Sequence, residues 1–118
     1  DGFFYFIDRK KDLIITGGEN IFPVDLEAVL IGQPKVRDVA IIGIPDERLG
    51  EVVAAVVEPK AGMAVTEQEM RAYFEPKLPK YAWPRLVLFG EVPRNPTGKI
   101  EKPKLRAKYK DVKWSAKG

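Results

Sequence analysis

Cysteine and histidine are both absent from this chain of 118 residues. Without cysteine there can be no disulfide and no thiolate metal site. Without histidine, the Ser/His/Asp and Cys/His types of nucleophilic catalysis, imidazole general bases and imidazole metal ligands are excluded as well. Any chemistry on this chain must therefore come from lysine, arginine, carboxylates or backbone groups. We expect the chain itself to bind no metal ion.

Long apolar runs are also missing, since none approaches the roughly eighteen residues that a membrane-spanning helix needs. The chain opens with Asp1-Gly2 and shows neither the basic start of a leader peptide nor an initiating methionine. We therefore expect a cytoplasmic protein without a membrane span, and the missing methionine suggests a fragment or a processed product. A composition of 45% apolar and 31% charged residues is typical of one folded domain.

A strong charge of either sign is lacking too, because 20 cations and 17 anions leave a net charge of only +3. Residues 99–113 are more basic than the rest, but nucleic-acid-binding modules usually carry a stronger imbalance. We expect no nucleic-acid partner. A stand-alone module whose basic C-terminal face recruits an acidic partner or nucleic acid is kept as the alternative.

Three apolar runs predict a small sheet. Val39–Ile44 and Val52–Val57 are nearly continuous and rich in β-branched residues, as buried central strands are. The short polar loop between them favours antiparallel pairing. Leu86–Phe89 predicts a third strand. Two further short runs, Phe3–Ile7 and Leu13–Thr16, predict a two-stranded ribbon around a charged turn.

Three segments predict helices. Pro23 suits a first helical position, and the apolar residues after it continue until Gly32. Thr66-Glu67-Gln68-Glu69 has the pattern of a capping box, with Val65 and Met70 in the positions of a hydrophobic staple. Residues 103–109 predict a short terminal helix.

These elements together predict an α+β domain with a mixed or antiparallel sheet of three strands and helices packed on it. We expect the ribbon, residues 1–16, to stand apart from an α+β body at residues 17–110. Residues 111–118 are predicted to form a poorly ordered tail.

Two prolines and a glycine surround Lys99 in the segment Pro93–Ile100. Proline fixes φ, and glycine permits backbone angles that other residues avoid, so the loop is predicted to present a long cation from a constrained turn. Such a cation suits a phosphate or carboxylate outside the domain, although an ordinary solvated turn is the simpler alternative. Gly98-Lys99 is not a P-loop, because that motif needs glycine at position 93 and Ser or Thr at position 100.

A second set of motifs changes the interpretation of Lys99. The turn Asp8-Arg9-Lys10-Lys11-Asp12, the pair Gly17-Gly18 and the segment through Glu27 precede the Pro-x-x-x-x-Gly-Lys motif by some seventy residues. In this order they resemble the C-terminal domain of the adenylate-forming enzymes, a superfamily of acyl-CoA synthetases, luciferases and peptide-synthetase adenylation domains. The resemblance covers nearly the whole chain.

The resemblance implies an activity and a partner domain. Family members use ATP to convert a carboxylate into an acyl-adenylate and pyrophosphate, and then transfer the acyl group to a thiol, usually that of CoA. The resemblance implies that this chain is a mobile lid whose large N-terminal domain lies elsewhere. That domain is expected to hold Mg2+, most ATP contacts and the acyl pocket, so the isolated chain is expected to be inactive.

The resemblance also assigns roles to particular residues. It implies that Lys99 enters the active site during adenylation, that Arg9 reaches the ribose of the nucleotide, and that Lys11 is the hinge. It implies that Gly17 and Gly18 line the CoA tunnel. It further places Asn20 at the nucleotide and Lys99 at a site that an acetyltransferase modifies in some relatives, where loss of charge would stop the reaction.

Subfamily features favour fatty-acyl and aryl-acyl CoA ligases. The sequence Gly-Gly-Glu-Asn-Ile followed by Phe-Pro-x-Asp-Leu-Glu is similar to theirs. Luciferases and coumarate ligases commonly carry lysine where this chain has Ile15, and peptide-synthetase domains typically have Asn-Gly-Lys instead of Thr-Gly-Lys. The lids of peptide-synthetase domains and luciferases are therefore the less favoured alternatives.

Overall fold

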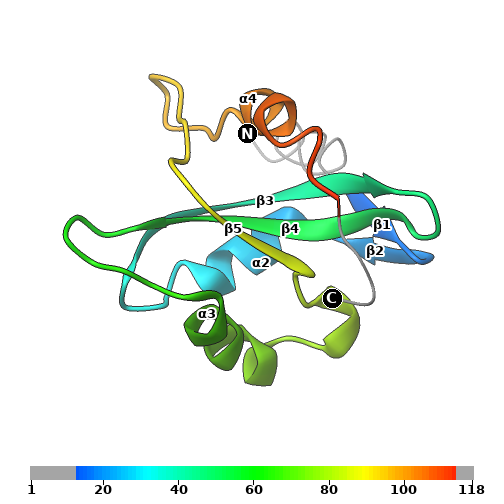
Figure 1. The fold of residues 1–118 in the computed structure, drawn as a ribbon, viewed down its shortest axis with the longest axis horizontal. Helices are drawn as coiled ribbons and strands as arrows, with labels where there is room; N and C mark the ends of the chain where they lie inside the picture. Colours follow the sequence, from blue (N-terminus) through cyan, green and yellow to red (C-terminus); the bar gives the residue numbers. More distant parts are fainter. Residues whose placement is uncertain (1–12, 114–118) are drawn as a thin grey trace.

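A computed structural model describes residues 13–113 and shows a five-stranded sheet between helices (Figure 1). The strands are β1 (Ile14–Thr16), β2 (Glu19–Ile21), β3 (Val36–Asp46), β4 (Gly50–Pro59) and β5 (Leu86–Phe89). The helices are α2 (Pro23–Leu30), α3 (Glu67–Phe74) and α4 (Lys102–Lys108), with two short 3₁₀ turns at Glu75–Lys77 and Lys80–Ala82. The α+β class is confirmed.

The sheet is mixed, and it has five strands where three were predicted. β3 and β4 form a long antiparallel hairpin, and β5 runs parallel to β4 on its other side. β1 also joins β4, through the pair Thr16 and Gly50, and β1 pairs with β2 along its length. The prediction that the strand Leu13–Thr16 stands apart from the sheet is therefore wrong. Its predicted partner, Phe3–Ile7, lies outside the described residues.

Both faces of the β3–β4 hairpin are covered, which explains its continuous apolar sequence. In Figure 1, α4 lies over one face of the sheet, and α2 and α3 lie over the other. Side chains alternate between the two faces along each strand. One core cluster includes Val39, Ile41, Val53, Ala55 and Val57 with residues of α2 and α3. The other includes Ala40, Ile42, Ile44, Val52, Ala54 and Val56 with Leu105 of α4.

A β-bulge at Arg37 interrupts this alternation near the start of β3. The pairing register shifts between Val36 and Asp38. Val36 and Val39 consequently belong to the same core cluster although they are three residues apart. A bulge inserts one unpaired residue and redirects the side chains that follow it. The bulge thus leaves Asp38 on the side of the sheet that α4 covers.

The helix boundaries follow from local chemistry. Pro23 begins α2, as predicted. At α3 the capping box is confirmed, because the Thr66 side chain accepts from the backbone N–H of Glu69 and the Glu69 side chain accepts from that of Thr66. Val65 and Met70, the predicted staple, are both buried in the core under α3. Within residues 13–113, no helix is both long and apolar enough to cross a membrane.

Candidate functional site: the Lys99 loop and the β1–β2 hairpin

The segment around Lys99 is a small hairpin between β5 and α4. Arg94 and Ile100 form an isolated antiparallel bridge at its base. Inside the bridge, the N–H of Asn95 donates to the carbonyl of Lys99 at 2.9 Å, and the N–H of Gly98 donates to the carbonyl of Asn95 at 2.8 Å. Gly98 has φ +91°, a left-handed conformation that favours glycine. The predicted constrained turn is therefore present.

Much of the constraint comes from Asn95, which sequence reasoning did not single out. Its Oδ1 accepts from the backbone N–H groups of Thr97 and Lys99, each at 3.0 Å, and from the Thr97 hydroxyl at 2.7 Å. Asparagine side chains commonly accept from the backbone two residues on and so mimic a turn. The Asn-Pro dipeptide before Gly98 was the signal that could have revealed this.

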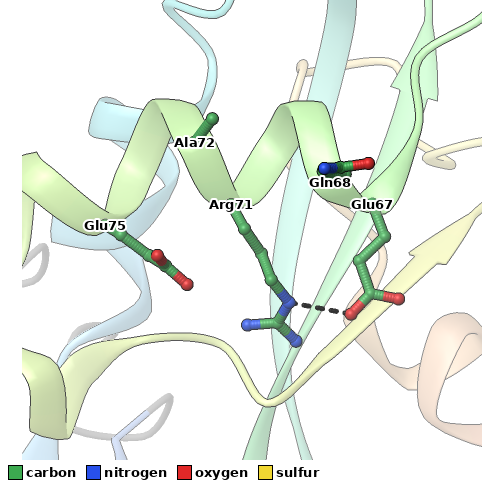
Figure 2. A pocket seen from close by; sticks show the side chains of 5 residues that line it. All are labelled: Glu67, Gln68, Arg71, Ala72 and Glu75. Carbon is green, nitrogen blue, oxygen red and sulfur yellow. Dashed lines mark hydrogen bonds and ion pairs between the residues drawn. The ribbon is translucent and has the colours of Figure 1, made fainter.

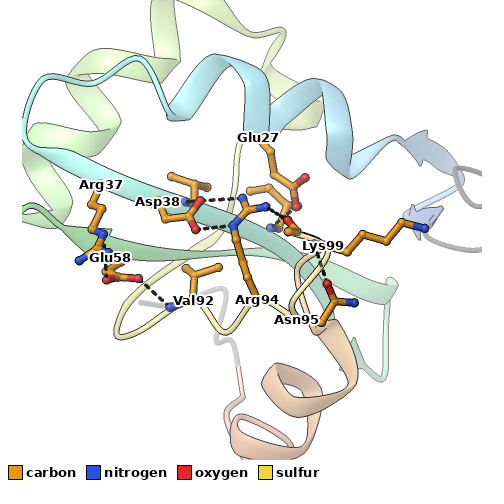
Figure 3. A network of polar contacts seen from close by, with 11 residues as sticks. Glu27, Arg37, Asp38, Glu58, Val92, Arg94, Asn95 and Lys99 are labelled. Carbon is orange, nitrogen blue, oxygen red and sulfur yellow. Dashed lines mark hydrogen bonds and ion pairs between the residues drawn. The ribbon is translucent and has the colours of Figure 1, made fainter.

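Arg94 fastens the loop to β3. Its Nε and Nη2 donate to the two carboxylate oxygens of Asp38 at 2.7 and 2.8 Å, and its Nη1 donates to the carbonyl of Gly98 (Figure 3). The Asp38 side chain is only 15% exposed, against 42% for Arg94. A two-pronged guanidinium–carboxylate pair fixes direction as well as distance.

The charge state of Asp38 reflects this contact. Burial by itself acts to raise the pKa of the Asp38 carboxyl. The hydrogen bonds from Arg94 and the N–H of Val39, together with nearby positive charge, outweigh burial, so the pKa lies below its ordinary value. Conversely, the hydrogen bond to Asp38 is the main reason that the pKa of Arg94 is raised. Both groups are charged at neutral pH.

Lys99 is exposed, and it lies opposite Asn95 next to the Arg94–Ile100 bridge, on the strand that returns from the turn. Figure 3 shows its side chain extending away from the Arg94–Asp38 pair, while its backbone N–H donates to Asn95. The backbone of Lys99 is thus held by hydrogen bonds within the loop, while its ammonium group points away from the Arg94–Asp38 pair. This arrangement fits an anionic group approaching from outside the domain.

Gly17 and Gly18 form the two-residue turn between β1 and β2. Both have positive φ, +56° and +87°, as a tight hairpin turn of this kind requires. The N–H of Gly17 donates to the carbonyl of Leu49 at 2.9 Å, which fixes the turn against the β3–β4 connection. A Cβ added at Gly18 would meet nothing within 4 Å. The backbone at Gly18 is therefore open to a group from outside.

Asn20 is the remaining described candidate. It is exposed on β2 and lines a hollow of about 180 Å³ that also includes Phe22 and Tyr81, two exposed aromatic side chains. Arg9 and Lys11 lie outside the described residues, so their predicted roles at the ribose and at the hinge stay predictions.

The two predicted parts of the site are attached to opposite ends of the β3–β4 hairpin. The Lys99 loop is attached at Asp38, whereas the Gly17-Gly18 turn is attached beside Gly50, which pairs with Asp46. Asp46 is eight residues after Asp38 along β3, which is about 26 Å at roughly 3.3 Å per residue. The two parts are therefore anchored at different points along the hairpin.

The large hollow beside α3 contains none of the predicted residues. It measures about 560 Å³ and is lined by Glu67, Gln68, Arg71, Ala72 and Glu75 (Figure 2). Arg71 is occupied there, because it donates to Glu67 at 2.8 Å and to the carbonyls of Pro84 and Arg85. Nowhere in residues 13–113 do three acidic side chains gather as metal ligands would.

Known proteins resemble this chain over most of its length. It is 48% identical over 110 residues to a long-chain-fatty-acid–CoA ligase of Mycobacterium tuberculosis, covering 92% of the chain and 22% of the ligase. It is 40% identical over 107 residues to a 2-succinylbenzoate–CoA ligase of Geobacillus, covering 90% of the chain and 22% of that enzyme. The chain thus spans about a fifth of the length of these relatives.

Solved structures share the fold. A fatty acyl CoA synthetase of Mycobacterium tuberculosis superposes with a TM-score of 0.79 at 48% identity, over 85% of this chain and 20% of the other. Apo MatB of Rhodopseudomonas palustris gives a TM-score of 0.82 at 39% identity, over 88% of this chain and 21% of the other. Residues 25–99, a match that ends at Lys99, fit the family described as AMP-binding enzyme C-terminal domain. The chain belongs to this family.

Proposed function

We propose that this chain is the C-terminal domain of an AMP-forming acyl-CoA or aryl-CoA ligase, in which it supplies Lys99 to adenylation. The reaction joins a carboxylate to the α-phosphate of ATP, releases pyrophosphate, and then passes the acyl group to CoA. The observation that carries the proposal is the hydrogen-bonded hairpin that presents the exposed Lys99, in a chain whose relatives include CoA ligases.

The role of Lys99 follows from its charge. Negative charge builds around the carboxylate and the α-phosphate as they react, and a positioned ammonium stabilises that charge. Lys99 lines none of the hollows beside α3, Trp83, Asp46 or Asn20. The remaining ATP contacts, Mg2+ and the acyl pocket are therefore expected in the N-terminal domain, which is the partner of this chain.

The Gly17-Gly18 turn is proposed to serve the second half-reaction. Because a side chain at Gly18 would occupy space that is now open, the bare backbone suits the close passage of a narrow pantetheine arm. Its attachment about 26 Å along β3 from that of Lys99 supports a domain that rotates between two poses, one for each half-reaction. Contacts of Asn20 with the nucleotide, acetylation of Lys99 and a cytoplasmic location stay predictions.

The experiment separates the two half-reactions in the full-length enzyme. We expect Lys99→Ala to slow pyrophosphate release by about 100-fold or more, since removal of one transition-state donor has an effect of this order. Thioester formation from a supplied acyl-adenylate should continue at the wild-type rate. Lys104→Ala, which removes an exposed lysine of α4 paired with Glu101, is the matched control and should change neither rate.

Two outcomes contradict the proposal. Equal losses in both half-reactions, in a variant that melts at the wild-type temperature, would remove the specific role of Lys99. Unchanged pyrophosphate release in Lys99→Ala would remove it altogether.

A further inference from the structure

Two ion pairs bracket the Lys99 loop. Arg94, five residues before Lys99, pairs with Asp38 at 2.7 Å, and Lys102, three residues after it, pairs with Glu27 at 2.8 Å. Lys102 is buried although it is a lysine, with its side chain only 11% exposed. The loop is therefore held by charge on both sides of the residue that it presents.

Both acidic partners are bound to the same strand. Among the described strands β3 pairs with β4 alone, so the N–H groups along its outer edge lack a partner in the sheet. The N–H of Val39 donates to Asp38 at 2.9 Å, and the N–H of Ile41 donates to Glu27 at 2.8 Å. Groups fixed on a strand hold a site more accurately than groups on loops. Figure 3 shows the cluster along this edge.

Arg94 makes the more direct connection to Lys99. One side of its guanidinium engages both oxygens of Asp38, and the other donates to the carbonyl of Gly98, the residue before Lys99. A rigid, planar group thus links the strand to the peptide that carries Lys99. Lysine at position 94 would keep the charge but would lose this fork.

We propose that Arg94 and Asp38 are positioning residues for Lys99, and that together they fix the direction in which its ammonium leaves the domain. The inference rests on the proposed role of Lys99 in adenylation. An error of about 1 Å in the position of a catalytic group can lower a rate by about 100-fold.

The first test measures the half-reactions in the full-length enzyme. We expect Arg94→Ala and Asp38→Asn each to slow pyrophosphate release by about 10- to 100-fold, with the KM for ATP within about twofold of wild type. Thioester formation from supplied acyl-adenylate should be unchanged. Arg94→Lys should fall between Arg94→Ala and wild type, and it provides a second variant should the alanine variant fold poorly.

Lys35→Gln is the matched control. Lys35 also pairs with an acidic side chain, Glu69 at 2.6 Å, and its side chain is 42% exposed, as that of Arg94 is. Its ammonium pairs with α3 and not with the Lys99 loop. Loss of a surface cation and its ion pair, without any effect on the loop, should leave both half-reactions at their wild-type rates.

A double-mutant comparison tests whether Arg94 acts through Lys99. Adding Arg94→Ala to Lys99→Ala should cost no further adenylation activity, because the group that it positions is already gone. A further loss of about tenfold in the double variant would overturn the inference and would assign Arg94 a separate role.

A measurement that does not depend on catalysis tests the Arg94–Asp38 contact separately from the proposed role of Lys99 in adenylation. The Arg94–Asp38 pair is called the clamp below. Limited trypsin digestion of the protein should cut after Lys99 several-fold faster in Asp38→Asn than in wild type or Lys35→Gln, since loss of the clamp lets the loop open more often. Unchanged cleavage together with unchanged adenylation in Asp38→Asn would overturn the clamp. If Lys99→Ala adenylates normally while cleavage still rises in Asp38→Asn, the clamp stands as a structural feature but the proposed function and the positioning role both fail.

Discussion

At the scale of single residues, the hairpin shows how the backbone of an exposed lysine is held in a fixed position. Asn95 accepts three hydrogen bonds within the turn, and Arg94 ties the turn to Asp38. Neither residue bears the charge that is proposed to act. Their effect is to remove freedom from the backbone of Lys99, so that only its side chain has to be ordered when a ligand arrives.

The depressed pKa of Asp38 predicts how the clamp depends on pH. Because the folded pKa lies below the ordinary value of 3.8, the pair stabilises the fold fully above that value, and this stabilisation is lost as pH falls through the folded pKa. The difference in free energy of unfolding between wild type and Asp38→Asn should be constant above about pH 5 and should shrink below about pH 4. Urea titrations at several pH values and constant salt measure it. A difference that grows on acidification would contradict the pairing.

Local signals predicted part of this site and no more. The proline and glycine around Lys99 indicated a constrained turn, and Gly17-Gly18 indicated a reversal of the backbone; both are present. Arg94 and Asp38 are 56 residues apart, and no local pattern connects them. Their meeting depends on the β3–β4 hairpin and on the bulge at Arg37, which only the assembled sheet defines.

At the scale of elements, α3 is the helix whose start the sequence predicts most clearly. The spacing of Thr66 and Glu69 predicted the capping box, and the structure has both of its hydrogen bonds. By contrast, β2 was not predicted, since its three residues have no run of apolar side chains. β2 forms because the Gly17-Gly18 turn returns the chain alongside β1, so it depends on the turn and on β1 and not on its own side chains.

The capping box gives a prediction for α3. Thr66→Ala removes the acceptor for the N–H of Glu69 and should lower the free energy of unfolding by about 1 kcal/mol. Thr66→Ser keeps a hydroxyl in place and should retain most of the stability. Urea unfolding of the chain, followed by circular dichroism, gives both values. An alanine variant as stable as the serine variant would show that the cap contributes nothing.

At the scale of the whole molecule, β3 and β4 supply both core clusters. Alternate residues of the same two strands pack under α4 and against α2 and α3. Loss of the hairpin would remove the packing of both clusters at once. The two layers are therefore expected to unfold together.

Matched truncations on the two faces test this coupling. Phe74 and Leu105 are 0% and 1% exposed on opposite faces, so Phe74→Ala should cost about 3–5 kcal/mol and Leu105→Ala about 2–5 kcal/mol. Both variants should still unfold in one transition, with amides of β3 and β4 exchanging together. Separate transitions in Leu105→Ala would mean that the α4 layer is an independent unit.

The carboxylates of Glu27 and Asp38 also affect whether a second copy of this chain can pair with the edge of β3. β3 has eleven residues, is rich in valine and isoleucine, and has one edge that no other described strand pairs with. An unpaired strand edge is a template on which a second chain can add a strand and begin a fibril. Glu27 and Asp38 occupy the N–H groups of Ile41 and Val39 that such a strand would use. The same two side chains that hold the Lys99 loop therefore also withdraw two backbone donors that an added strand would need.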